Sequence, residues 1–282
     1  MGLLSTKHFI GLENAEKKDI DTLIEYGYMF KEVLDRPIKK VPSLNGVNIA
    51  NLFFENSTRT KLSFELAEKR LSADVINFSA SSSSINKGET FKDTVQNIHA
   101  MKIDCVVMRH PIPGSCIQLA NFVDSVIVNA GDGTHEHPTQ AMLDIMSIKE
   151  KFGKIKGLKI GIVGDILHSR VALSNIFGLT ALGANVKVCG PPHLIPINIQ
   201  DLGIEVEYNF DSMIEWADAL NMLRIQRERM GTGIVPSNRE YRALYGLTKE
   251  RLSKHKKELV VMHPGPMNRG VEIDSYVADS DQ

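Results

Sequence analysis

A cluster of hydroxyl side chains around one arginine follows a largely apolar segment near the start of the chain: Ser57-Thr58-Arg59-Thr60. The segment 47–54 before it has the composition of a buried strand, and leucines at helical spacing follow it. The first turn of a helix has N–H groups without intrahelical partners and a positive dipole end, so the cluster could hold a phosphate. The alternative is that Ser57 only caps the helix and Arg59 is solvated.

Further cationic or polar residues follow other predicted strands: Lys87, Arg109, His137, Arg170, Arg224 and Arg269. Each alone would be an ordinary solvated side chain. Together they indicate a cleft for ligands with several negative charges, because arginine pairs bidentately with phosphates and carboxylates. No residue stands out as a catalytic base. The chemistry we expect therefore relies on positioning and on electrostatic stabilisation.

Other motifs in the sequence carry weaker signals. His135-Glu136-His137 could begin a metal site, but no further ligand cluster has a recognisable spacing. Gly161 and Gly164 follow a predicted strand, yet the third glycine of a dinucleotide fingerprint is missing. Neither a Walker-type loop nor a nucleophile elbow is present. We expect no metal and no cofactor.

The elements that position these residues alternate between strands and helices. Predicted strands cover 47–54, 75–78, 105–108, 126–128, 158–163, 185–189, 204–207, 219–222 and 259–262. Predicted helices cover 19–34, 62–71, 90–101, 116–122, 138–152, 171–182 and 212–216. The polar clusters follow the carboxyl ends of strands, where open parallel sheets bind ligands. The fold class we expect is α/β, with two α/β domains that each have a central parallel sheet flanked by helices.

The length of 282 residues, with 43% hydrophobic residues, is enough for two ordinary domains. We place the first domain, which contains the hydroxyl cluster, at 1–137. An interdomain helix follows at 138–152, and the second domain spans 153–282. The two halves share no visible sequence repeat.

Composition narrows the class of partner. A net charge of −1 gives no electrostatic reason to expect nucleic acid or an anionic membrane. No apolar run approaches the roughly 20 residues of a membrane span, and the start has no signal-peptide pattern. The three cysteines, Cys105, Cys116 and Cys189, lie far apart and are flanked by apolar residues, as is typical of buried thiols in a reducing cytosol. We expect a cytoplasmic protein.

Seven motifs in order resemble those of the transcarbamoylase family. They are found at 54–65, 87–90, 108–111, 131–140, 164–170, 224–229 and 262–270. Within the family the sequence is most similar to the aspartate-specific catalytic chains. The resemblance implies transfer of the carbamoyl group of carbamoyl phosphate to the α-amine of L-aspartate. The products would be N-carbamoyl-L-aspartate and phosphate, a step of de novo pyrimidine biosynthesis.

The resemblance also implies roles for residues of the first domain. The phosphate of carbamoyl phosphate would be held by Ser57, Thr58, Arg59 and Thr60. The carbamoyl oxygen would receive hydrogen bonds from Arg109, His137 and Thr60, as in an oxyanion hole. Gln140 and the backbone carbonyls of Gly265 and Pro266 would bind the carbamoyl NH₂. The resemblance further implies a cis peptide before Pro266, and the leaving phosphate could accept the proton of the attacking amine.

The aspartate carboxylates would be bound by Arg170, Arg224 and Gln226, together with Lys87. The resemblance implies a homotrimer with shared active sites, in which Ser83 and Lys87 enter from the adjacent subunit on a serine-rich loop. That loop could otherwise be a flexible linker. Regulatory chains or other pyrimidine-pathway chains are possible partners. Members of the family continue into a final helix that packs on the first domain, and we expect it to be absent from these 282 residues.

Two alternatives remain open. An ornithine-type transcarbamoylase would have a cysteine in the motif at 263–266 and would lack Arg224 and Gln226. Ornithine also needs an acidic partner for its second amine, whereas two arginines suit two carboxylates. The second alternative is a non-catalytic anion-binding homologue within a larger pyrimidine assembly. The presence of all the motif side chains favours an enzyme.

Overall fold

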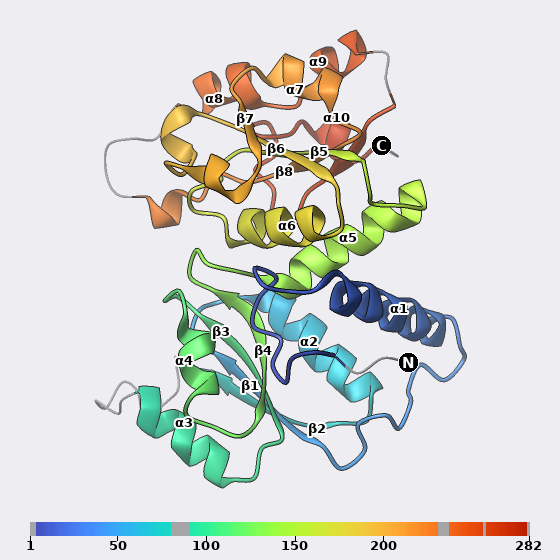
Figure 1. Ribbon diagram of the computed structural model, residues 1–282, viewed down its shortest axis with the longest axis vertical. Helices are drawn as coiled ribbons and strands as arrows, with labels where there is room; N and C mark the ends of the chain where they lie inside the picture. Colours follow the sequence, from blue (N-terminus) through green and yellow to red (C-terminus); the bar gives the residue numbers. More distant parts are fainter. Residues whose placement is uncertain (1–3, 80–90, 231–236, 256–257, 281–282) are drawn as a thin grey trace. The chain divides into compact units, whose positions relative to one another are not determined.

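The computed structural model describes residues 4–79, 91–230, 237–255 and 258–280 (Figure 1). The chain forms two compact units, Met1–Met142 and Leu143–Gln282. The division falls within helix α5 (Pro138–Phe152), which has the bounds that the sequence predicts for the interdomain helix. The assignment of α5 as a linker between domains stays a proposal.

The first unit contains a parallel sheet in the strand order β2-β1-β3-β4. Over the described residues its strands are β1 (Asn48–Phe53), β2 (Asp74–Ser79), β3 (Cys105–His110) and β4 (Val126–Asp132). Its helices are α1 (Lys17–Leu34), α2 (Thr58–Arg70), α3 (Phe91–Ala100) and α4 (Ser115–Ala120). Leu52 and Met108 pack with residues of α3 and α4, while Ile49 and Val107 pack with Phe64 of α2. Both faces of the sheet are covered, which explains its nearly continuous apolar strands.

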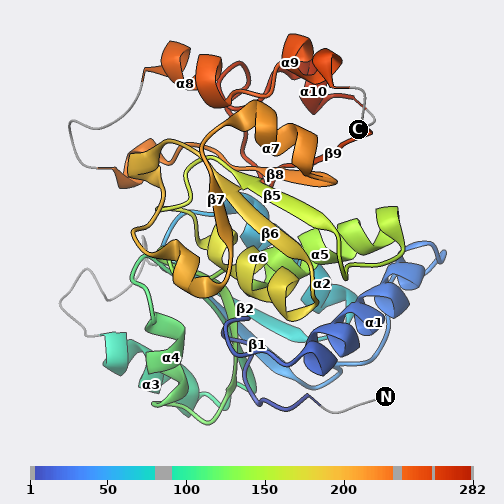
Figure 2. The same cartoon turned by 45° about the horizontal axis from the view of Figure 1, so that its top comes forward.

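The second unit contains a parallel sheet in the strand order β7-β6-β5-β8-β9. Its described strands are β5 (Lys159–Val163), β6 (Asn185–Cys189), β7 (Glu205–Glu207), β8 (Ala219–Met222) and β9 (Val260–Met262). Its helices are α6 (Arg170–Ala181), α7 (Phe210–Trp216), α8 (Asn238–Tyr245), α9 (Lys249–Lys254) and α10 (Ser275–Ala278), with 3₁₀ turns η3 (Pro192–Leu194), η4 (Ile199–Leu202) and η5 (Arg227–Arg229). Helix α6 covers one face of the sheet, and α7, α8 and α9 lie on the other (Figures 1 and 2). The predicted class, two α/β domains with central parallel sheets, is confirmed.

In each sheet the order in which the chain adds strands changes direction once. In the first unit the chain passes from β1 outward to β2 and then returns to add β3 on the other side of β1. In the second unit β6 and β7 lie on one side of β5, and β8 lies on the other. Ligands bind outside the carboxyl ends of strands at such switch points. Ligand-binding residues are therefore expected at the carboxyl ends of β1 and β3 in the first unit and of β5 and β8 in the second.

Helix α2 differs from a simple amphipathic pattern. The leucines whose spacing predicted it, Leu62 and Leu66, are 59% and 49% exposed. Glu68 is instead buried and accepts a hydrogen bond from Nδ2 of Asn51 at 2.8 Å. Helical spacing thus predicted the element correctly but not the side that packs on the sheet.

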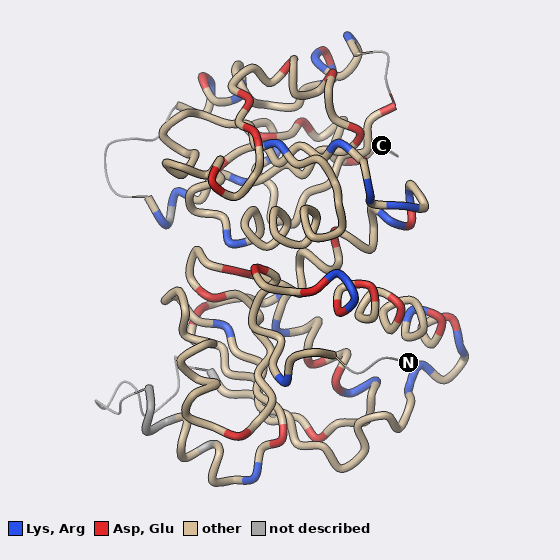
Figure 3. Tube along the Cα trace, viewed as in Figure 1, with Lys and Arg blue, Asp and Glu red and all other residues tan. Residues whose placement is uncertain are grey.

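Charged residues of both signs are interspersed along the chain, as the net charge of −1 suggests (Figure 3). Among the described residues, no helix is long and apolar enough to cross a membrane.

Candidate active site

Arg109 and Thr60 meet at the switch point of the first sheet. Arg109 of β3 is paired in register with Phe53, the last residue of β1, so it lies beside the start of α2. Its Nη1 donates to the carbonyl oxygen of Ala130 at 3.2 Å and to Oγ1 of Thr60 at 3.5 Å. Two of the predicted donors to a carbamoyl oxygen are thus neighbours.

Arg109 is also contacted by Glu55, a residue for which no role was predicted from the sequence. Its Oε1 lies 2.8 Å from Nε of Arg109, and the two side chains are 21% and 13% exposed. An arginine held in this way keeps a fixed direction for its remaining N–H groups. The sequence signals for Glu55 are its place in the motif at 54–65 and in the turn directly after β1.

The start of α2 offers hydrogen-bond donors. Ser57 occupies the N-cap position, but its side chain makes no capping hydrogen bond in the structure. The first intrahelical bond runs from the N–H of Lys61 to the carbonyl of Ser57 at 3.1 Å, and Thr58 and Arg59 are exposed. This geometry does not support a role of Ser57 as a side-chain cap alone. It suits an anion at the helix start.

His137 and Gln140 lie where β4 passes into α5. His137 is 8% exposed, and its Nδ1 lies 3.3 Å from Oγ1 of Thr139. Gln140 is partly buried, and its N–H donates to the carbonyl of His137 at 3.0 Å. The side chains of His137 and Gln140 therefore come from one short segment, the residue before α5 and the first turn of that helix.

Two buried carboxylates hold the loop before His137. Glu136 accepts the N–H of Leu12 at 2.8 Å and that of Glu13 at 3.1 Å. Asp132 accepts the N–H of Gly114 at 2.8 Å and lies 3.1 Å from Nδ1 of His135. Burial acts to raise the pKa of Asp132, but hydrogen bonds from His135 and Asn129 hold it below its ordinary value. The contacts of His135 and Glu136 thus stabilise the loop. Within the described chain these residues belong to no cluster suited to a metal ion.

At the switch point of the second sheet, Asp165 joins the loops that follow β5 and β8. Its Oδ1 accepts from the backbone N–H of His168 at 3.2 Å, and its Oδ2 accepts the N–H of Gln226 at 3.0 Å. Arg170 is the first residue of α6 and is 4% exposed, while Arg224 and Gln226 are partly buried. The predicted ligands for carboxylates thus come from the two loops at this switch point.

Gly164 allows the same two loops to approach each other. Its φ is +131°, and a Cβ at this position would lie 2.6 Å from the carbonyl oxygen of Leu223. Any other residue would force the loops apart.

The segment after β9 also has its expected conformation. The Gly265–Pro266 peptide is cis, as the resemblance implies. Gly265 has a φ of +64°, and its N–H donates to Nδ1 of His263 at 2.8 Å.

Two of the residues singled out from the sequence are not described by the structure, and a third, Arg269, is engaged in an ion pair. Ser83 and Lys87 lie outside the described residues. Arg269 is exposed and forms a bidentate pair with Asp279, with both N–O distances at 2.7 Å. Its place after a strand was the only ground for including it with the other cations, and its pair with Asp279 adds no support for a role in the site.

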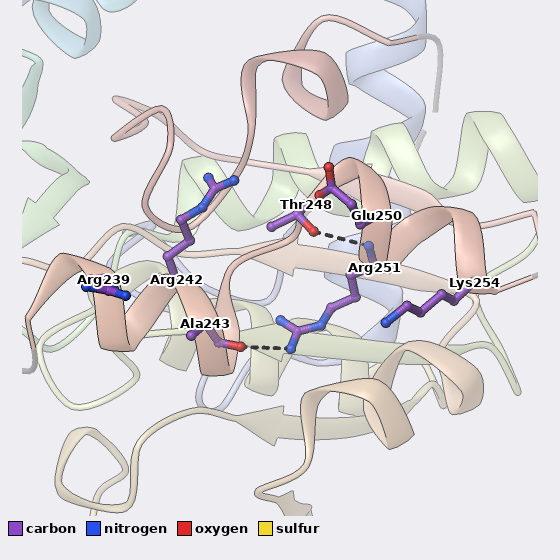
Figure 4. A pocket seen from close by; sticks show the side chains of 7 residues that line it. All are labelled: Arg239, Arg242, Ala243, Thr248, Glu250, Arg251 and Lys254. Atoms are coloured by element: carbon purple, nitrogen blue, oxygen red, sulfur yellow. Dashed lines mark hydrogen bonds between the residues drawn. The ribbon is translucent and has the colours of Figure 1, made fainter.

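A cationic hollow lies between α8 and α9, lined by Arg239, Arg242, Ala243, Thr248, Glu250, Arg251 and Lys254 (Figure 4). Arg242 pairs with Asp274, and Nε of Arg251 lies 2.7 Å from Asp211. Arg251 also donates to the carbonyls of Ala243 and Gly246. The inner arginines therefore hold the helices together, and none of the predicted site residues lines this hollow.

Both halves of the chain match models of one protein family. Residues 7–150 match the aspartate/ornithine carbamoyltransferase carbamoyl-P binding domain, and residues 156–282 match the aspartate/ornithine carbamoyltransferase Asp/Orn binding domain. The chain belongs to the aspartate/ornithine carbamoyltransferase family. The resemblance predicted from the motifs is confirmed.

Similar curated proteins are named aspartate carbamoyltransferase catalytic subunit. That of Christiangramia forsetii is 62% identical, over 99% of this chain and 90% of the relative. That of Flavobacterium psychrophilum is 61% identical, over 99% of this chain and 91% of the relative.

Solved structures agree with these relatives. Aspartate transcarbamoylase from Trypanosoma cruzi, in complex with carbamoyl phosphate and aspartate, has a TM-score of 0.84 at 29% identity, over 99% of this chain and 89% of that chain. The catalytic subunit of M. Jannaschii aspartate transcarbamoylase has a TM-score of 0.82 at 34% identity, over 98% of this chain and 91% of that chain.

Proposed function

We infer that the chain is an enzyme that transfers the carbamoyl group of carbamoyl phosphate to the α-amine of L-aspartate. The products are N-carbamoyl-L-aspartate and phosphate. Relatives that are about 60% identical bear the name of this activity, and similar solved structures contain these two substrates. The structural observation that carries the inference is the meeting of Arg109 with Thr60 beside the start of α2.

We propose that the start of α2 binds the phosphate. Ser57, Thr58, Arg59 and Thr60 supply hydroxyl, guanidinium and backbone N–H donors. The support is the helix start without a side-chain cap and the exposure of Thr58 and Arg59. Bound there, the phosphate is held as the leaving group.

The carbamoyl oxygen is assigned to Arg109, His137 and Thr60. When the amine nitrogen attacks the carbamoyl carbon, negative charge grows on this oxygen, and donors already in place stabilise it. The Glu55 and Ala130 contacts of Arg109 support such preorganisation. The carbamoyl NH₂ is assigned to Gln140 and to the carbonyls of Gly265 and Pro266.

Aspartate is assigned to Arg170, Arg224 and Gln226, with Lys87 from an adjacent subunit. The three cationic side chains and the amide of Gln226 would bind its two carboxylates and leave the neutral amine directed at the carbon. As the new C–N bond forms, the C–O bond to phosphate breaks, and the departing phosphate accepts the amine proton. The motif His263-Pro264-Gly265-Pro266 has no cysteine, and no acidic residue is assigned to a second amine, which favours aspartate over ornithine.

We propose a homotrimer with shared active sites, in which Ser83 and Lys87 come from the neighbouring subunit. The name catalytic subunit among the relatives supports assembly into a larger complex, which leaves room for regulatory or other pyrimidine-pathway chains. A cytoplasmic location is supported by the free thiols. Burial raises the pKa of Cys105 and Cys189 to about 12, so both stay protonated.

The test is a carbamoylation assay with radiolabelled carbamoyl phosphate and purified protein, with aspartate and ornithine in parallel reactions. We expect labelled N-carbamoyl-L-aspartate and no product from ornithine above the rate without an acceptor amine. A preference for ornithine would reject the assigned substrate. Absence of any labelled product, from a folded protein that binds carbamoyl phosphate, would reject catalysis.

A further inference from the structure

Glu272 is a fully buried carboxylate without a role in the transfer step. Its exposed fraction is 0%. Its Oε1 lies 3.3 Å from Nε2 of His263 and accepts the N–H of Asn268 at 2.5 Å. One oxygen atom therefore contacts the chain on both sides of the Gly265–Pro266 peptide.

The hydrogen bonds determine which nitrogen of His263 carries the proton. Nδ1 accepts the N–H of Gly265 at 2.8 Å, so it must be unprotonated. Nε2 then carries the hydrogen and donates it to Glu272. The His263 side chain is 4% exposed, so water has little access to this relay. A continuous path of hydrogen bonds runs from Glu272 through His263 to Gly265.

The backbone of Glu272 is fixed to the core of the second unit. Its carbonyl accepts the N–H of Leu247 at 3.0 Å, and the next residue, Ile273, forms a bridge with Leu247. Leu247 and Ile273 are 0% and 2% exposed within the core cluster. The carboxylate thus connects the rigid core to the 263–268 segment. Burying a charged group is costly, and a site that needs a fixed backbone is a reason to retain one.

We propose that Glu272 is a positioning residue for carbamoyl transfer, which fixes the direction of the Gly265 and Pro266 carbonyls through His263 and Asn268. The proposal rests on the proposed function, which assigns these carbonyls to the carbamoyl NH₂. A shift of the carbonyls would turn the reacting carbon away from the amine. The aspartate carboxylates are assigned to other residues, so the loss should fall on kcat and not on the aspartate KM.

The first test compares two substitutions of Glu272. Glu272→Leu removes the acceptor, whereas Glu272→Gln keeps an oxygen that can accept from His263 and Asn268. We expect Glu272→Leu to lower kcat by about 10- to 100-fold, with the aspartate KM changed by less than about twofold, and Glu272→Gln to keep kcat within about threefold of the wild type. The control is Glu258→Leu, since Glu258 is 80% exposed and pairs with Lys151 at the surface. An unchanged kcat in Glu272→Leu, or an equal loss in Glu272→Gln, would overturn the proposal.

The second test asks whether Glu272 acts through His263. His263→Asn keeps an acceptor for the N–H two residues later, as in an Asx turn, but its side chain is too short to reach Glu272. Combined with Glu272→Leu, it should lower kcat little more than the more damaging single substitution does. Additive losses would show that the two residues act separately.

A third measurement needs neither turnover nor a Leu variant that folds. Imidazole ¹⁵N shifts of the wild type and of Glu272→Gln should show His263 neutral, with the proton on Nε2. A ring protonated on Nδ1 in the wild type would overturn the relay. Failure of the wild type to carbamoylate aspartate would instead reject the proposed function, so the two failures are distinguishable.

Discussion

Nε of Arg109 lies 2.8 Å from Oε1 of Glu55, so the guanidinium that faces Thr60 is held from its other side by a carboxylate. Glu55→Gln would weaken this pair and let the guanidinium turn. We expect kcat to fall by about tenfold with little loss of stability. Steady-state kinetics with a urea titration would check this. Glu65→Gln is the matched control, because Glu65 pairs with Lys69 at the surface of α2. Equal kcat values for the two variants would contradict the role of Glu55.

Arg109→Ala and His137→Ala should affect turnover more than binding. Both donors are assigned to an oxygen whose charge grows in the transition state, so we expect kcat losses on the order of 100-fold. The affinity for carbamoyl phosphate, measured by calorimetry, should fall much less. An affinity loss as large as the loss of kcat would show that these residues bind the ground state equally well.

Arg224→Ala should mainly raise the aspartate KM, because its assigned partner is an aspartate carboxylate. Carbamoyl phosphate binding should stay near the wild-type level. Arg227→Ala is a suitable control, since Arg227 is exposed and bonds to Asn238. An aspartate KM of Arg224→Ala equal to that of the wild type would contradict the assignment of Arg224 to an aspartate carboxylate.

The pair of His135 with Asp132 predicts a pH dependence of stability. The hydrogen bond to Asp132 raises the pKa of His135 above its ordinary 6.5, and the pKa of Asp132 is lowered below 3.8. The contribution of His135 is therefore complete below pH 6.5 and is lost as the pH rises through its folded-state pKa. That of Asp132 is present above pH 3.8 and is lost as the pH falls through its lowered pKa.

The measurement is urea unfolding of the wild type and of His135→Asn from about pH 4 to about pH 9, a range that covers the His135 transition and lies above that of Asp132. We expect the difference in free energy of unfolding to be largest between about pH 4 and 6 and to shrink toward pH 9. His193→Asn, at an exposed histidine, is the control. A difference that grows with pH would contradict the assigned pair.

Much of the arrangement could be predicted from the sequence, because buried parallel strands and the polar residues after them leave a local pattern. The end of β1 was predicted in this way, and so were Arg109 and Arg224 as candidate site residues. Glu55 and Glu272 were not, since a carboxylate that holds another side chain is recognised only from its tertiary contacts. The pair of Arg269 with Asp279, ten residues later in the chain, is likewise recognised only from the structure.

Some short helices were also missing from the elements predicted from the sequence. Helices α8, α9 and α10, of eight, six and four residues, were not predicted, although the similarly short α4 and α7 were. Elements of this length give little periodicity. The exposed leucines of α2 show the related limit that spacing identifies a helix but not the neighbour on which it packs.

The two oxygens of Asp165 serve different loops, one after β5 and one after β8. The separation of these loops is therefore set by the width of a single carboxylate. An attempt to adapt the enzyme to a longer amino acid would have to replace this bridge between the loops as well as the arginines. Exchange of Arg224 alone should abolish the present preference without creating a new one.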